Sequence, residues 1–283
     1  MTTTLVVGGI APGPALASCE ELARRGAHVI VHGRSESACR SALVRLAAAA
    51  PSATFSTVTG EVATLADVRA LASNVYARFE RLDRLVVFGG IERWLRYVNA
   101  DGVEETLAQN HVAPFYLTRL LAPLLRRSAP ARVLFVASVA HRFGRLRWDD
   151  LGAERWFSPE DAFRQSELAM ATSAMALARR FQDDGVMVNL LEAGLSRPSF
   201  SEPETWRLRL WHNVMQAALL RPAEVVARDV ATAVLDPVYA SVTGACLRRG
   251  RVHRAGGRAA DPQAQEKLWS VTSEICGLSG ATV

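Results

Sequence analysis

Two carboxylates stand at positions suited to acid–base chemistry. Glu167 lies four residues after Phe163 in a segment of helical period, so both side chains would lie on the same face of one helix. Glu192 stands at the end of an apolar run typical of a buried strand. An apolar setting raises the pKa of one carboxyl while another stays ionised, which is the arrangement that proton transfer requires. Both residues are therefore candidate catalytic residues.

Each carboxylate also has an ordinary structural interpretation. Glu167 could form a salt bridge with a nearby arginine such as Arg164 or Arg197, and Glu192 could be the solvated end of a loop. Four cysteines are scattered without the spacing of a zinc or redox motif, so no metal site is indicated. The sequence leaves the catalytic and the structural interpretations open.

Glycines mark a turn near the start of the chain. An apolar run ends at Gly8, and Gly9 and Gly13 follow before a segment of helical period. Glycines between a strand and a helix let the backbone approach a pyrophosphate at the helix N-terminus. Gly9 and Gly13 are therefore candidate cofactor contacts, although an ordinary tight turn explains the pattern equally well.

Apolar runs of strand type alternate with segments of helical period along the chain, which predicts βαβ units. The expected strands cover residues 4–7, 28–32, 53–57, 84–88, 132–136, 186–191 and 245–247. The expected helices cover residues 14–25, 35–50, 65–81, 102–126, 160–183 and 223–233. We therefore expect an α/β fold: a single Rossmann-like domain over residues 1–283, with a doubly wound, mainly parallel sheet of seven strands flanked by helices. Right-handed crossovers then place the crevice at the carboxyl ends of the strands.

The composition narrows the classes of partner. The 283 residues carry a formal net charge of +5, and 49% are hydrophobic. Lys267 is the one lysine among the 33 basic residues, which we attribute to GC-rich codon usage in preference to a nucleic-acid surface. The densest arginine cluster, residues 248–258, is interpreted as a solvated loop. No apolar run reaches the roughly 18 residues of a membrane span, so we expect no membrane partner. The scattered cysteines indicate a reducing compartment, so we expect a cytoplasmic protein, and the spread of the arginines argues against a nucleic-acid partner.

The segment around Ser138 carries the most specific motif. Residues 137–144 have the sequence Ala-Ser-Val-Ala-His-Arg-Phe-Gly, and further short motifs follow at residues 149–152, 156–159 and 165–166. Asn110-His111 and the tail over residues 242–269 add to the pattern. In order and spacing the chain resembles the short-chain dehydrogenases/reductases, in particular the branch of retinol dehydrogenase-like and protochlorophyllide reductase-like enzymes.

The resemblance implies a catalytic site that this chain has partly lost. In the family a serine, a tyrosine and a lysine, the last two in a YxxxK helix, make the site, and the serine matches Ser138. The YxxxK position has Phe163 and Glu167, and no YxxxK occurs elsewhere. Phenylalanine has no proton to exchange, and glutamate reverses the charge beside it. Ser138 together with Asn110 would then orient a substrate oxygen.

The cofactor contacts implied by the resemblance are also weakened. Pro14 stands where the family offers a backbone N–H to the phosphate, and proline has none. The family's Asn-Asn-Ala-Gly segment is here Val87–Gly90, and Pro198 replaces a threonine that holds the carboxamide. Arg34 is placed to meet a ribose 2′-phosphate, which favours NADP over NAD, although it could equally be an ordinary surface arginine. We expect no cofactor requirement for turnover and a weakened affinity for NADP.

These departures favour a short-chain dehydrogenase/reductase fold without the hydride-transfer machinery. We expect a non-redox enzyme of the cyclase, dehydratase or isomerase type that acts on a small but bulky apolar biosynthetic intermediate. The alternatives are a non-catalytic relative that binds a ligand or partner, and an atypical NADP-dependent oxidoreductase. The oligomeric state stays open, and a homodimer or a tetramer is possible. The family implies a substrate lid around residues 195–220, and the expected pocket residues are Phe163, Tyr97, Trp206, Trp211 and His212.

Overall fold

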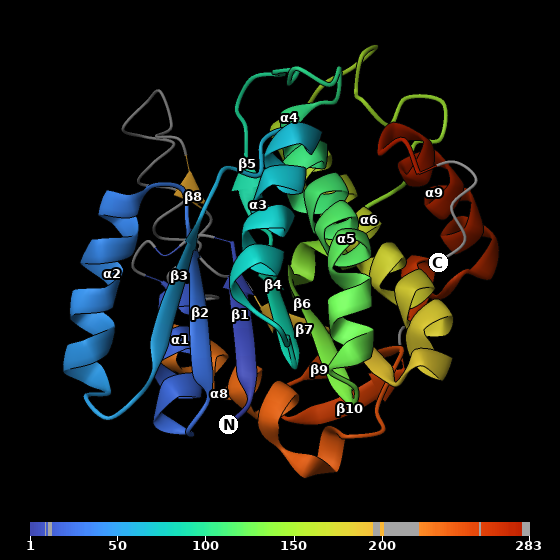
Figure 1. Cartoon of the computed structure of the whole chain (residues 1–283). Coiled ribbons are helices and arrows are strands. Elements are labelled where there is room, and N and C mark those ends of the chain that lie inside the picture. Colours follow the sequence, from blue (N-terminus) through green and yellow to red (C-terminus); the bar gives the residue numbers. More distant parts are fainter. Residues whose placement is uncertain (9, 11–12, 195–198, 201–220, 255, 279–283) are drawn as a thin grey trace.

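A twisted sheet forms the centre of the molecule (Figure 1). The computed structural model describes residues 1–8, 10, 13–194, 199–200, 221–254 and 256–278. The strands of the main sheet are β1 (Thr3–Val7), β2 (His28–Gly33), β3 (Phe55–Thr59), β4 (Arg84–Phe88), β6 (Ala131–Ser138), β7 (Val186–Gly194), β9 (Ala245–Arg248) and β10 (Arg251–Arg254). Their order is β10-β9-β7-β6-β4-β1-β2-β3, and the pairs are parallel except for β9 with β10. The predicted mainly parallel, doubly wound sheet is confirmed, with one strand more than expected.

Helices cover both faces of this sheet. They are α1 (Pro14–Arg24), α2 (Glu36–Ala49), α3 (Leu65–Arg78), α4 (Glu105–Leu107), α5 (Ala113–Arg127), α6 (Pro159–Phe181), α8 (Ala223–Leu235) and α9 (Pro262–Ile275). One apolar core lies between the sheet and α1, α2 and α8, and a second lies between the sheet and α3, α5 and α6, with α9 packed on α6. Because both faces are covered, the central strands are almost continuously apolar.

The arginine cluster near the C-terminus forms a hairpin, so its interpretation as a loop is wrong in part. Arg248 ends β9, and residues Arg251–Arg254 form the antiparallel edge strand β10. Arg249 and Gly250 connect the two strands, with φ angles of +49° and +68°. Two central residues with positive φ are typical of tight hairpin turns, because their twist matches that of the strands.

The expected helix over residues 102–126 is interrupted at its start. Residues Glu105–Leu107 form the short helix α4, a π-helical turn covers Ala108–Val112, and α5 follows. A π-helical turn inserts one extra residue into a helix and changes the direction of the side chains around it. Asn110 lies within this turn.

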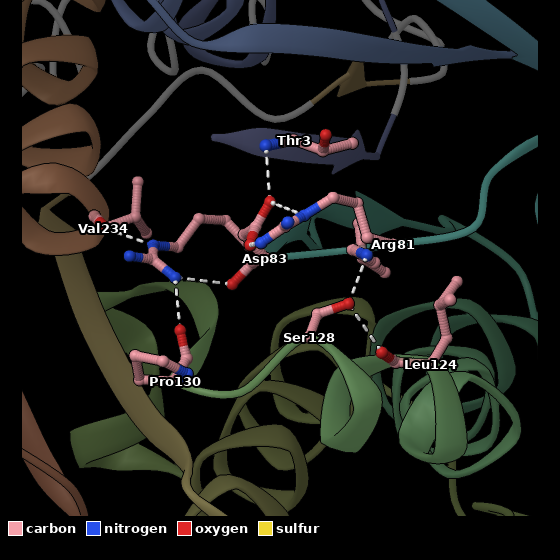
Figure 2. Close-up of polar contacts among 9 residues, drawn as sticks. Thr3, Arg81, Asp83, Leu124, Ser128, Pro130 and Val234 are labelled. Carbon is pink, nitrogen blue, oxygen red and sulfur yellow. Dashed lines mark hydrogen bonds and ion pairs between the residues drawn. The ribbon is translucent and has the colours of Figure 1, made fainter. Parts of the chain in front are cut away.

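A network of polar side chains holds the amino-terminal edge of the sheet (Figure 2). Asp83 Oδ2 accepts hydrogen bonds from the Thr3 amide at 2.8 Å and from Arg81 Nε at 3.1 Å. Arg84 Nε donates to the Val234 carbonyl at 2.6 Å, which links β4 to the end of α8. These groups join neighbouring strands at the edge opposite the carboxyl ends. The candidate site lies at the other edge.

Besides β10, three further strands and helices among the described residues were not expected from the sequence. Two are the short strands β5 (Ile91–Glu92) and β8 (Ser199–Phe200), which pair in parallel as a separate small sheet. The third is α9, whose first residue is Pro262 and whose N-cap is Asp261. No helix within the described ranges is both long and apolar enough to cross a membrane.

Candidate functional site

Ser138 and Glu167 meet at the carboxyl end of β6. Ser138 is the last residue of that strand, and Glu167 lies in the third turn of α6. Oε2 of Glu167 accepts a hydrogen bond from the Ser138 backbone N–H at 2.6 Å. Oε1 lies 3.5 Å from the point where a side chain on Gly89 would begin, so it faces the turn that follows β4. The structure therefore brings two predicted site residues together at the edge of the sheet where ligands bind in such folds.

Burial determines the protonation of the Glu167 carboxyl. The side chain is 1% exposed, and this burial raises its pKa to about 8, although the Ser138 amide favours the charged form. Among the described residues, that amide is its one hydrogen-bond partner. Arg164 pairs with Asp161 at 3.4 Å instead, and Arg197 lies outside the described residues. The carboxyl is therefore mainly protonated at pH 7 and has a proton to donate.

The Ser138 hydroxyl can still donate a hydrogen bond. Its Oγ accepts one from the Ala140 amide at 3.2 Å. A hydroxyl carries one proton as well as its lone pairs, and no described residue accepts that proton. Ser138 can therefore offer its O–H to a ligand oxygen beside Glu167.

The hydrogen-bonding groups of Asn110 are occupied within the protein. Oδ1 accepts from the amides of Gly90 at 3.0 Å and Ile91 at 2.9 Å. Nδ2 donates to the Ile91 carbonyl at 2.7 Å and to Ser166 Oγ at 3.0 Å. A carboxamide has two donors and two lone pairs, so none is left for a substrate. Asn110 fixes the turn after β4 against α6 and acts as a positioning residue.

Glu192 takes part in a buried ion pair. It lies within β7 and is 4% exposed, so it is not the solvated end of a loop. Its Oε2 accepts from Arg142 Nε at 2.6 Å, and Arg248 and His141 approach the carboxylate at 3.8 Å and 3.9 Å. Glu192 belongs to the carboxyl edge of the sheet, where its described partners are these three basic side chains.

The expected pocket residues are described only in part. Phe163 is half-buried on α6, one turn before Glu167, while Tyr97 is 49% exposed. Most of the expected lid over residues 195–220 lies outside the described residues, except for the backbone of β8. The same holds for four individual predicted residues: Gly9, Trp206, Trp211 and His212.

The sequence analysis missed another buried carboxyl at this edge, Glu92. It ends β5 and is 8% exposed, and no described residue forms a hydrogen bond or an ion pair with it. Burial, followed by the nearby charge of Glu160, raises its pKa to about 7, while Arg164 acts in the opposite direction. The available signal was a carboxylate directly after Gly89, Gly90 and one apolar residue at the end of a strand.

Comparison with known proteins identifies the family. The family model for short chain dehydrogenases matches residues 3–153, which is more than half of the chain. The chain belongs to the short-chain dehydrogenase family. It is 30% identical to human retinol dehydrogenase 12, with 97% of this chain and 86% of that protein aligned. It is 31% identical to bovine dehydrogenase/reductase SDR family member 13, over 97% of this chain and 73% of that protein.

Solved structures share the same fold. A crystal structure of an uncharacterized protein from Mycobacterium paratuberculosis aligns with a TM-score of 0.75 and 24% identity, over 98% of this chain and 94% of that one. The NADP active-site complex of Pseudomonas aeruginosa RhlG aligns with a TM-score of 0.67 and 25% identity, over 87% of this chain and 94% of that one. The Rossmann-like fold is thereby confirmed.

Members of this family usually bind NAD(P), and the two ends of the crevice differ in how well they fit it. At the phosphate end, α1 begins at Pro14 after Gly13, without a side-chain cap or an acidic residue in its first turn. Arg34 stands 62% exposed, 3.8 Å from Glu61. This end fits a phosphate apart from the N–H that proline lacks.

The nicotinamide end does not fit the dinucleotide. Phe163 offers no hydroxyl, and the nearby Glu167 offers a buried carboxyl bonded to the Ser138 amide in place of the family's lysine. A neutral or negative group there cannot supply the positive charge that lowers the pKa of a tyrosine in related enzymes. We therefore derive no step through NADP.

Proposed function

We propose that this short-chain dehydrogenase relative is a non-redox enzyme that transfers protons on a bulky apolar carbonyl compound. The observation that carries the proposal is the buried Glu167 carboxyl, bonded through one oxygen to the Ser138 amide. The other oxygen faces the turn after β4. A carboxyl that stays protonated near neutral pH is an effective general acid.

Each group of the site has a separate role in this proposal. Glu167 donates its proton to the substrate carbonyl oxygen, and the Ser138 hydroxyl hydrogen-bonds to the same oxygen. Half-buried Phe163 shields the pair from water and contacts the apolar part of the substrate. Asn110 holds the opposite wall in place. The enol forms when a base removes a proton from the carbon next to the carbonyl while Glu167 protonates the oxygen. Return of a proton to carbon gives the rearranged ketone, and no electron is gained or lost.

A second candidate function is a non-catalytic binding protein. It is favoured by polar groups that already have partners within the protein. The Asn110 side chain is bonded to the backbone of Gly90 and Ile91 and to Ser166, and Glu192 is paired with Arg142. A protein of this kind would keep the carboxyl of Glu167 for structure alone. The two candidates differ in whether Glu167 changes a rate.

Exchange of carbon-bound hydrogen in α-tetralone provides the test. This bulky ketone exchanges the hydrogens next to its carbonyl through the enol, and proton NMR in D₂O follows their loss. The wild type should accelerate exchange over buffer, and Glu167→Gln should lower the added rate by ~10²-fold or more. The exposed Glu274 provides the matched control, since Glu274→Gln should leave the rate unchanged. Absence of acceleration, or full activity of Glu167→Gln, would favour the binding protein.

A further inference from the structure

Glu92 has the features of a group that meets a ligand. Its side chain is more than nine-tenths buried, and within the described residues it has no hydrogen-bond or ion-pair partner. Its oxygens are not among the fully enclosed side-chain atoms that lack a partner. A buried carboxyl without a partner is costly in a folded protein, and such groups are usually kept where they serve a site. Its oxygens therefore keep some contact with the protein surface, where a ligand can reach them.

The segment that carries Glu92 runs along the face of α6 that carries Glu167. At one end of the segment, Gly89 lies beside Glu167 Oε1. At the other end, the charge of Glu160 raises the pKa of Glu92 and the charge of Arg164 lowers it. Residues spaced by four and then three positions, as these helical residues are, share one face of a helix.

Glu92 lies beside α6 within about one to two turns of Glu167. From Glu167 back to Arg164 and to Glu160, whose charges act on Glu92, the helix rises by about 4.5 Å and about 10 Å at its usual 1.5 Å per residue. Half-buried Phe163 lies on the same face. At the shorter end of this range, an acid and a base can reach a carbonyl oxygen and the carbon next to it.

The backbone holds Glu92 firmly in this position. The Asn110 carboxamide bonds both the N–H and the carbonyl of Ile91, the preceding residue. On its other side, Glu92 pairs in register with Phe200 in β8. β8 stands within the region that the family uses as its substrate lid. The backbone of Glu92 is thus held between the Asn110 side chain and β8.

We propose that Glu92 is the second catalytic carboxyl of the crevice, the base that removes a proton from the carbon next to the substrate carbonyl while Glu167 protonates the carbonyl oxygen. This inference rests on the proposed function. The C–H bond breaks and its proton passes to the Glu92 carboxylate, and its electron pair forms the carbon–carbon double bond of the enol. The carbonyl oxygen takes its proton from Glu167. Return of a proton from Glu92 to carbon, with return of the enol O–H proton to the Glu167 carboxylate, restores the ketone and both carboxyls.

The same α-tetralone exchange assay tests this assignment with the full chain. Glu92→Gln should lower the added exchange rate by ~10²-fold, and Glu92→Asp should retain part of it. Glu160→Gln removes a negative neighbour of Glu92, so the acidic limb of the pH–rate profile should move to lower pH. A merely structural Glu92 would not move that limb. Glu274→Gln again serves as the control.

The outcomes separate this inference from the proposed function. If Glu167→Gln is inactive while Glu92→Gln exchanges like the wild type, Glu92 is not the base and the proposed function stands. If the wild type adds nothing to the buffer rate, both are contradicted. If Glu92→Gln does not fold, Glu92→Asp and the pH–rate profile of Glu160→Gln test the assignment instead. If the acidic limb of that profile does not move and Glu92→Asp is fully active, the assignment of Glu92 as the base is contradicted.

Discussion

At the level of single residues, Glu167 determines what the crevice can do. A lysine at this position would present a positive charge, whereas the carboxyl accepts the Ser138 amide and carries its own proton. Phe163 and Glu167 suit each other chemically: the aromatic ring lowers the polarity around the carboxyl, and this favours the neutral form of Glu167. The site therefore exchanges the properties of a cation for those of a weak acid.

The raised pKa of Glu167 predicts how stability depends on pH. The pKa lies at about 8 in the folded protein and near its ordinary value of 4.5 in the unfolded chain, so the folded protein binds the extra proton between these values. The contribution of Glu167 to stability is fully present below the lower value and is lost as pH rises through the upper one, by on the order of a few kcal/mol. Glu167→Gln should remove this dependence.

Urea denaturation of both proteins at about pH 5 and about pH 9 measures the effect. The wild type should lose free energy of unfolding relative to Glu167→Gln between the two conditions. Glu274→Gln, which alters an exposed carboxyl, should follow the wild type. A constant difference between wild type and Glu167→Gln would show that the carboxyl is ionised throughout.

At the level of elements, the turn after β4 depends on one side chain. Asn110 satisfies the amides of Gly90 and Ile91 and the carbonyl of Ile91. Asn110→Ala would leave these groups unpaired, and each buried group without a partner costs about 1–3 kcal/mol. We expect thermal or urea unfolding to show a loss of at least ~2 kcal/mol.

Asn74→Ala is the matched control for this prediction. Asn74 makes one side-chain hydrogen bond, to the Thr59 carbonyl at 3.3 Å, and is half-buried. Its loss should cost about 1 kcal/mol or less. Equal effects of the two substitutions would mean that Asn110 does not hold the turn.

The sequence predicts long elements of this fold better than short ones. Periodicity and buried apolar runs locate the central strands, and β4 is found with its observed bounds, Arg84–Phe88. The two-residue strands β5 and β8 are too short to show any period, because their pairing depends on tertiary contacts. Helix α9 did carry a signal, since Asp261 and Pro262 are a typical helix start.

For the candidate site, too, the sequence predicts some placements and not others. The resemblance places Phe163 and Glu167 at the family's YxxxK positions at the crevice, and their spacing of four residues puts both on one helix face. Ser138 lies at the same edge because it ends a parallel strand. The partners of Asn110 and Glu192 could not be predicted, because each depends on a turn or side chain far away in sequence. Glu92 was missed for that reason too: its burial depends on how β5 packs on α6.

At the level of the whole molecule, the altered site predicts weak binding of the family's dinucleotide. A ligand at one hundred times its dissociation constant stabilises a folded protein by ~2.7 kcal/mol. Because the nicotinamide end does not fit, we expect no measurable change in Tm at millimolar NADPH. A shift of several degrees that Arg34→Ala reduces for NADPH but not for NADH would instead show an intact dinucleotide site.

The central claim is that this crevice transfers protons and not hydride. The most direct measurement mixes the purified wild type with NADPH and all-trans-retinal and follows the near-ultraviolet absorbance of NADPH. The structure predicts no decrease beyond that of a mixture without protein, because Phe163 and Glu167 cannot act as the tyrosine and lysine of the family. A steady decrease that disappears in Ser138→Ala would contradict the claim.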